Sequence, residues 1–136
     1  MSTGGTPPLR LSEQPVHLGL GARAVPQPAF TGMEWYADYA ERTAADGDEC
    51  RLVSLYTFAQ DWDSWEMHPA GDEVVVCVAG EMTVTQELPD GIVRQVTLAA
   101  GDYAINAPGV WHTADIAAHA TVLFITAGIG TQHRPR

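Results

Sequence analysis

Three carboxylates and one histidine lie close together in the segment WEMHPAGDE, at residues 65–73. Glu66 and His68 are separated by one residue, so on a β-strand both side chains project from the same face. A short loop with proline and glycine then leads to Glu73, at the start of an apolar run. Carboxylate and imidazole groups both bind divalent transition metals. An acidic loop that simply precedes a buried strand would have the same residues. The segment alone leaves a metal site and an acidic loop as alternatives.

A second segment, GDYAINAPGVWH at residues 101–112, carries another imidazole. A Gly-Asp turn opens a short strand, a Pro-Gly turn follows it, and His112 comes three residues after Gly109. His112 is therefore expected on a second pair of strands. Strands and tight turns must position all of these side chains.

The chain from Arg51 onward has the pattern of short strands separated by turn signals. Runs of β-branched and aromatic residues alternate with turn residues such as those at Asp90-Gly91. The predicted strands are RLVSLYTFA, EVVVCVAG, EMTVTQEL, IVRQVTL, YAINAP and ATVLFITAG. Strands at this spacing, joined by tight turns without intervening helices, predict an antiparallel sandwich or barrel.

The region before the predicted strands has a different composition. Residues 1–30 are rich in proline and glycine, so we predict an extended arm that lies against the domain or against a partner subunit. One short helix is predicted within residues 31–47, with Thr31 as its cap and Gly47 at its end. Its apolar face, expected to pack on the sheet, consists of Met33, Trp35, Tyr36, Tyr39 and Ala40.

The composition argues against several classes of partner. The formal charge is −10 with only seven Lys and Arg, which disfavours nucleic acid and an anionic membrane surface. No apolar run approaches the length of a membrane span, and the N-terminal stretch lacks the apolar segment of a secretory signal. Cys50 and Cys77 are too few for a disulfide framework, so a reduced, cytoplasmic location is expected.

Residues 66–80 resemble the first signature motif of the cupin superfamily, a group of small double-stranded β-helix (jelly-roll) barrels. That motif is His-x-His, three or four residues, Glu, six residues, Gly. This chain has Glu66-x-His68, four residues, Glu73, six residues and Gly80. Only the first histidine of the motif is replaced.

Residues 101–112 resemble the second cupin motif, which is Gly, five residues, Pro-x-Gly, two residues, His, three residues, Asn. Gly101, Gly109 and His112 keep their positions. The resemblance implies an all-β jelly-roll barrel with a short N-terminal helix and an extended N-terminal arm. It also implies a single cupin domain over residues 31–136, with its barrel core at about residues 50–128.

Three positions depart from the motifs. Glu66 stands where the first histidine is expected, and Ile116 stands where the second motif has Asn. Pro108 falls one place later than the motif proline, which changes the turn and leaves the spacing of the glycines intact. Glu66 is the departure that bears on function, because it changes a ligand position.

Carried over by position, the resemblance implies that His68, Glu73 and His112 bind a divalent metal ion. If Glu66 also binds, two imidazoles and two carboxylates suit Fe, Mn, Zn or Ni without selecting one. If it does not, the other three form the two-His-one-carboxylate set of open non-haem iron sites. In a third interpretation no metal binds and the side chains bond to a ligand or to one another. Two neighbouring carboxylates without a cation repel, which favours the metal.

Further residues surround these positions. Four of them are either the wall of a small-molecule pocket or core and rim packing: Trp65, Met82, Tyr103 and Trp111. Asn106 and Asp115 flank His112 and are candidates to orient its ring. The remaining histidines are expected to be solvated: His17, His119 and His133.

Two classes of function are compatible with the resemblance. The first is a metal-dependent enzyme of oxygenase, isomerase, lyase or cyclase type that acts on a small organic molecule. In it, Glu66 completes the metal shell or serves as a catalytic general base. The second is a non-catalytic binding or sensing module with a degenerate metal site, which the changes at Glu66 and Ile116 favour. A metal-free epimerase acting on a sugar nucleotide is disfavoured, because only Arg51 and Arg94 lie in the barrel segments. The resemblance also implies a homodimer.

Overall fold

The computed structural model describes residues 4–136, which contain nine β-strands, one α-helix and one 3-10 helix. The N-terminal elements are β1 (Val16–Gly19), β2 (Arg23–Pro26), α1 (Glu34–Arg42) and the 3-10 helix η1 (Ala44–Asp46). The remaining strands are β3 (Arg51–Phe58), β4 (Ser64–Met67), β5 (Glu73–Glu87), β6 (Val93–Ala99), β7 (Tyr103–Asn106), β8 (Trp111–Thr126) and β9 (Gln132–Pro135).

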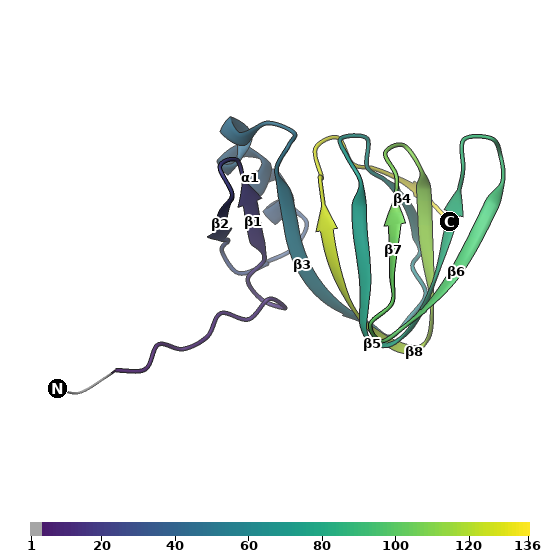
Figure 1. The fold of residues 1–136 in the computed structure, drawn as a ribbon, viewed down its shortest axis with the longest axis horizontal. Helices are drawn as coiled ribbons and strands as arrows, with labels where there is room; N and C mark the ends of the chain where they lie inside the picture. The colour runs from purple at the N-terminus through teal and green to yellow at the C-terminus, as the bar shows by residue number, and fades with distance from the viewer. Residues whose placement is uncertain (1–3) are drawn as a thin grey trace.

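The long strands β5 and β8 form the centre of the fold. They pair antiparallel along most of their length, from Val74 opposite Ile125 to Glu87 opposite Trp111. β3 and β4 pair with β8, while β6 and β7 pair with β5. Both long strands turn at the lower end in Figure 1, so the sheet curls into a barrel. The predicted all-β barrel is confirmed.

Gly80 is placed where β5 bends. The pairing of β5 with β8 shifts register on either side of it, between Cys77 and Ala79 and between Gly80 and Met82. Gly80 has φ of 78°, and a Cβ added there would lie 2.0 Å from the backbone oxygen of His119. No other residue fits this close approach of the two strands. The motif glycine is therefore a requirement of the bent strand.

The inward faces of the strands fill the barrel with apolar side chains. The buried cluster consists of Val75, Cys77, Met82, Val84, Leu98, Ala114, Ile116, Ala120, Val122 and Phe124. Along β5 these residues alternate with outward-facing ones, as expected for a strand with one buried face. Aromatic side chains of Phe58 and Trp62 pack against the cluster from its edge.

The N-terminal region extends the sheet beyond β3 (Figure 1). Within the predicted arm, β1 and β2 form a hairpin, and β1 pairs with β3 through Val16 opposite Val53. The sequence pattern did not predict this hairpin. Its tight turn contains Ala22, the one non-glycine residue with positive φ among residues 4–136.

The predicted helix is confirmed, but its cap is not Thr31. The residue before the first helical turn is Met33, and its side chain makes no capping hydrogen bond. The helix ends at Arg42 with Thr43 as its C-cap, and the 3-10 turn that follows is capped by Gly47, whose φ is 67°. Trp35 is the buried residue of α1, and its indole N–H donates to the Pro28 carbonyl at 3.0 Å. No helix among the described residues is long and apolar enough to cross a membrane.

His17 is buried, which corrects the prediction that it is solvated. Its Nε2 lies 2.6 Å from Asp46 Oδ2, and its Nδ1 lies 2.5 Å from the Tyr39 hydroxyl. Asp46 also accepts two hydrogen bonds from Arg23. The imidazole therefore ties the hairpin to α1 and the turn after it, a contact between distant segments that the sequence does not reveal.

Candidate metal centre

Strand register brings the candidate ligands together at one end of the barrel. Glu66 lies on β4 directly opposite His112 on β8. His68 follows the end of β4, and Glu73 is the first residue of β5, opposite Asn106 on β7. Directly opposed residues on neighbouring strands face the same side of a sheet, so these side chains all point into the barrel. His68, Glu73 and His112 are buried, whereas the Glu66 side chain is 29% exposed.

The two imidazoles face both carboxylates with their Nε2 atoms. His68 Nε2 lies 3.1 Å from Glu73 Oε2, and His112 Nε2 lies 3.3 Å from Glu73 Oε1. Each of the two nitrogens is 3.8 Å from the same oxygen of Glu66, Oε2. One atom each from Glu66, His68 and His112 lies within 4.8 Å of the other two. The nitrogen and oxygen atoms of the four side chains therefore face one another in one cluster.

Hydrogen bonds on the far side of each ring define which nitrogen faces the cluster. The Thr131 hydroxyl donates to the Gly128 carbonyl at 2.8 Å, so at 2.8 Å from His68 Nδ1 it must accept. The Val110 carbonyl, 3.3 Å from His112 Nδ1, is also only an acceptor. A neutral imidazole that donates through Nδ1 presents a lone pair at Nε2. Both lone pairs are thus directed at the carboxylates.

Unpaired lone pairs in this position need a partner. In these neutral rings, the buried Nε2 atoms of His68 and His112 face no hydrogen-bond donor among the residues that the structure describes. Lone pairs directed at carboxylates are stable only with a cation or a proton between them. Imidazole nitrogens oriented by hydrogen bonds to Nδ1 are the usual form of metal-binding histidines. The residues present therefore fit a divalent metal ion.

Glu73 accepts hydrogen bonds from two neutral side chains. The Asn106 side chain donates to Oε1 at 3.0 Å, and the Thr126 hydroxyl donates to Oε2 at 2.6 Å. Asn106 therefore orients Glu73 and not the His112 ring. Asp115, the other candidate for that task, instead pairs with Arg136. The sequence did not predict the contact of Thr126 with Glu73, because it depends on how the strands pair in the fold.

The charges of the cluster are strongly coupled in the metal-free protein. Burial by itself raises the pKa of Glu73, but hydrogen bonds and charge from His112 and His68 hold it far below its usual range. Burial also raises the pKa of Glu66, but the effect of His112 is larger and lowers that pKa below its usual value. For His112, burial lowers the pKa, and the facing carboxylates raise it to about 9. The site therefore keeps its carboxylates ionised and attracts a positive charge to the imidazole nitrogens.

The four residues suggested as a pocket wall are not gathered around this cluster. Trp65 and Trp111 both stack on the guanidinium of Arg134, at 4.9 and 4.7 Å from the ring centres. Adjacent residues on a strand face opposite sides, so these two rings lie on the outer side of the sheet, away from Glu66 and His112. Met82 is fully buried within the apolar core.

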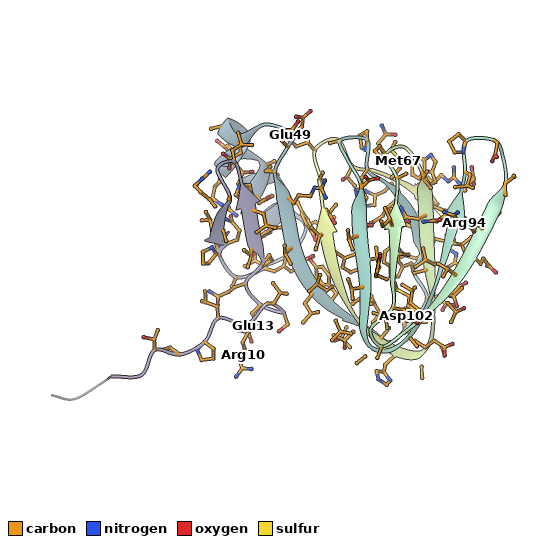
Figure 2. All side chains as sticks on the ribbon, in the orientation of Figure 1. Arg10, Glu13, Glu49, Met67, Arg94 and Asp102 are labelled. Carbon is orange, nitrogen blue, oxygen red and sulfur yellow. The ribbon has the colours of Figure 1, made fainter. Side chains whose placement is uncertain are left out.

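Tyr103 lies at the other end of the barrel and is 64% exposed. Figure 2 shows its neighbour Asp102 at the lower end of the barrel and Met67, next to both Glu66 and His68, at the upper end. One aromatic side chain that does approach the cluster is Trp62, whose ring centre lies 6.2 Å from that of His112. Its indole nitrogen is buried without a hydrogen-bond partner among the described residues.

His133 is a site residue that the sequence did not reveal. It lies on β9 directly opposite Glu66, and its Nε2 is 3.2 Å from Glu66 Oε1. Its side chain is 48% exposed, so the prediction of a solvated histidine describes only part of its environment. This contact exists because β9 pairs with β4, and the sequence did not predict that pairing.

Comparison with known proteins identifies the fold. No family model and no curated protein matches the sequence. Solved structures do match: oxalate decarboxylase from Bacillus subtilis has a TM-score of 0.54 and 16% identity, over 71% of this chain and 26% of that chain. An oxalate oxidase has a TM-score of 0.53 and 16% identity, over 60% of this chain and 44% of that chain. Peruvianin-I, described as a cysteine peptidase from Thevetia peruviana latex, has a TM-score of 0.51 and 19% identity, over 60% and 54%.

These similarities are at the level of the fold. This chain spans between 26% and 54% of the length of the three proteins, and no identity exceeds 19%. The similarities show that this chain has the jelly-roll fold that its resemblance to the cupin motifs predicted.

Proposed function

We propose that this protein is a metal-dependent cupin enzyme that acts on a small organic molecule. The observation that carries the proposal is the pair of buried Nε2 atoms on His68 and His112, which face two carboxylates and are satisfied only with a cation or a proton between them. Manganese is the first ion to test, since the comparison with oxalate decarboxylase is to a protein described by its Mn(II) centres. Iron, zinc and nickel suit the same donors.

The surroundings of the four residues suggest a different role for Glu66 than for the other three. His68, His112 and Glu73 are buried and oriented by other groups, so they would hold the ion. Glu66 is the member of the cluster with access to solvent, so a substrate would reach the cluster beside it. When bound, the metal supplies a Lewis acid or a centre for oxygen activation. Glu66 would complete the shell or take a proton from the substrate.

Metal content of the purified protein tests the proposal. Protein made without a histidine tag, with iron, manganese, zinc and nickel supplied, should contain about one ion per chain. His68→Ala and His112→Ala should each lose it, while His119→Ala, at an exposed histidine of β8, should keep it. A metal-free parent protein under these conditions would refute a metal enzyme and leave a non-catalytic binding module.

Glu66 is tested separately, because its two proposed roles give different results. If Glu66→Ala lowers the metal content, the carboxylate is a ligand. If the variant keeps the ion and loses turnover, the carboxylate is a general base. Full metal content together with unchanged turnover would exclude both roles.

We also propose that the protein forms a homodimer through the outer face of its sheet. Cross-strand pairing aligns five β-branched residues across five strands: Ile105, Val74, Ile125, Val53 and Val16. Directly opposed residues face the same side, and none in this row is charged. In a chain of net charge −10, an uncharged apolar face is where a second copy can approach with least repulsion.

Light scattering tests the dimer. Ile105→Lys, at a residue that is 49% exposed, should shift the protein from dimer to monomer at micromolar concentration. Ile92→Lys, at a residue outside the row that is 57% exposed, is the control. A monomeric parent protein would refute the proposal.

Within the described part of the chain Cys50 and Cys77 are buried thiols without a disulfide, which supports a reducing, cytoplasmic location as part of the same proposal.

A further inference from the structure

The segment 131–135, which includes the strand β9, contacts the metal cluster at two points. β9 itself lies along β4. Antiparallel pairing places His133 opposite Glu66 and Arg134 opposite Trp65. Thr131, just before β9, is two residues from His133, and it reaches His68. Two side chains of one segment therefore each contact a different member of the cluster.

The contact with Glu66 separates the functions of its two carboxylate oxygens. A carboxylate only accepts, so His133 Nε2–H donates to Oε1 at 3.2 Å. The other oxygen, Oε2, is the one that lies 3.8 Å from both His68 and His112. The hydrogen bond fixes the carboxylate so that one oxygen faces the imidazoles.

The contact with His68 fixes the ring in the tautomer that binds metal. The Thr131 hydroxyl donates to Gly128, so its oxygen accepts the Nδ1 proton of His68. The lone pair of His68 is thereby kept at Nε2, which faces the cluster. Without an acceptor at Nδ1, the ring is free to take the other tautomer or to rotate.

The segment is itself held in place by contacts outside the cluster. The guanidinium of Arg134 contacts the rings of Trp65 and Trp111 and pairs with Glu87 at 2.6 Å. Arg136 donates to Asp115 and to the Trp62 carbonyl. These anchors do not depend on an ion, so the segment 131–136 holds its two contacts before any ion binds.

We infer that Thr131 and His133 are positioning residues of the metal centre, which orient His68 and Glu66 through the two hydrogen bonds described. This inference rests on the proposed metal function. Neither residue is a ligand: each acts on the far side of a group that faces the cluster. Hydrogen-bond partners of ligands typically change metal affinity by about 10- to 100-fold when they are removed.

Titration of the metal-free protein with Mn2+ and with Co2+ tests the inference. We expect His133→Ala and Thr131→Val each to weaken binding by about 10- to 100-fold while keeping one site per chain. His133→Gln, which keeps an N–H donor, and Thr131→Ser, which keeps the hydroxyl, should recover most of the affinity. His119→Ala and Thr97→Val, at exposed positions away from the cluster, are the matched controls. The Co2+ absorption spectrum should change in the first two variants and return in the two rescue variants.

The outcomes separate the inference from the function on which it rests. If the parent protein binds Mn2+ or Co2+ and both His133→Ala and Thr131→Val bind equally well, the inference is wrong and the metal site stands. If His133→Ala loses the ion as completely as His112→Ala, His133 is a ligand, which also overturns it. If the parent protein binds neither ion, the proposed function and the inference fall together. Thermal unfolding of each metal-free variant shows whether a loss reflects misfolding, and the rescue variants then decide.

Discussion

The side-chain amide of Asn106 donates to Oε1 of Glu73 at 3.0 Å, and both residues are buried. The bond is the last in a chain, because Asn106 accepts from Gln86 at 2.8 Å and Gln86 accepts from the exposed guanidinium of Arg94. The orientation of each amide is therefore fixed by the next. Glu73 presents its oxygens to the two imidazoles because a network reaching the surface determines how its carboxylate is turned.

Removal of this donor should destabilise the protein. Asn106→Ala leaves Glu73 Oε1 and the Gln86 amide short of a buried partner, which costs about 2 kcal/mol in free energy of unfolding. Urea unfolding of the metal-free protein measures the loss. Gln60→Ala, at an exposed residue, is the control and should change stability by less than about 0.5 kcal/mol. Unchanged stability in Asn106→Ala would show that the buried carboxylate does not need this donor.

Metal affinity should rise with pH. The pKa of His112 in the metal-free protein is about 9, because the carboxylates of Glu66 and Glu73 outweigh the effect of burial. The ion binds only the deprotonated ring, so a proton must leave His112 at any lower pH. Apparent affinity for Mn2+ should therefore increase by about tenfold per pH unit up to pH 9 and then level off. Titrations between pH 6.5 and pH 9.5, with about one proton released per ion, check this; a flat profile contradicts it.

Local sequence patterns predicted much of the fold and only part of the site. The alternation of EVVVCVAG and the Pro-Gly and Asp-Gly turns are local, so strands could be assigned without knowing their partners. The two motif glycines and their spacing to His112 then indicated which barrel the strands form. Strand pairing explains why Glu66, His68, Glu73 and His112 lie together, and the motif spacing had anticipated that arrangement.

The remaining site contacts depend on pairings that leave no trace in sequence spacing. His133 and Thr126 reach Glu66 and Glu73 from strands 67 and 53 residues away in the chain. The suggested pocket residues Trp65 and Trp111 were chosen as sequence neighbours of ligands, but neighbours on a strand face opposite sides. Sequence distance was therefore the wrong guide to what surrounds the cluster.

Replacement of Glu66 should change which metal the site prefers. Glu66→His removes one negative charge and replaces a hard oxygen donor by an imidazole, which suits zinc and nickel better than manganese. Competition titrations should show the ratio of Zn2+ to Mn2+ affinity rising relative to the parent protein. Glu66→Gln, which removes the charge and keeps an oxygen, is the control and should weaken both ions. An unchanged ratio in Glu66→His would show that this side chain does not contact the ion.

Two glycines with the same backbone conformation should differ sharply in their tolerance of a side chain. Gly80 and Gly91 have φ of 78° and 83°. A Cβ at Gly91 meets nothing within 4 Å, so Gly91→Ala carries only the cost of a left-handed alanine, about 1 kcal/mol. A Cβ at Gly80 would lie 2.0 Å from the His119 carbonyl oxygen, so the strands must also move apart. Gly80→Ala should therefore cost more than about 3 kcal/mol in unfolding free energy. Equal losses in the two variants, measured by urea unfolding, would show that β5 and β8 can separate there freely.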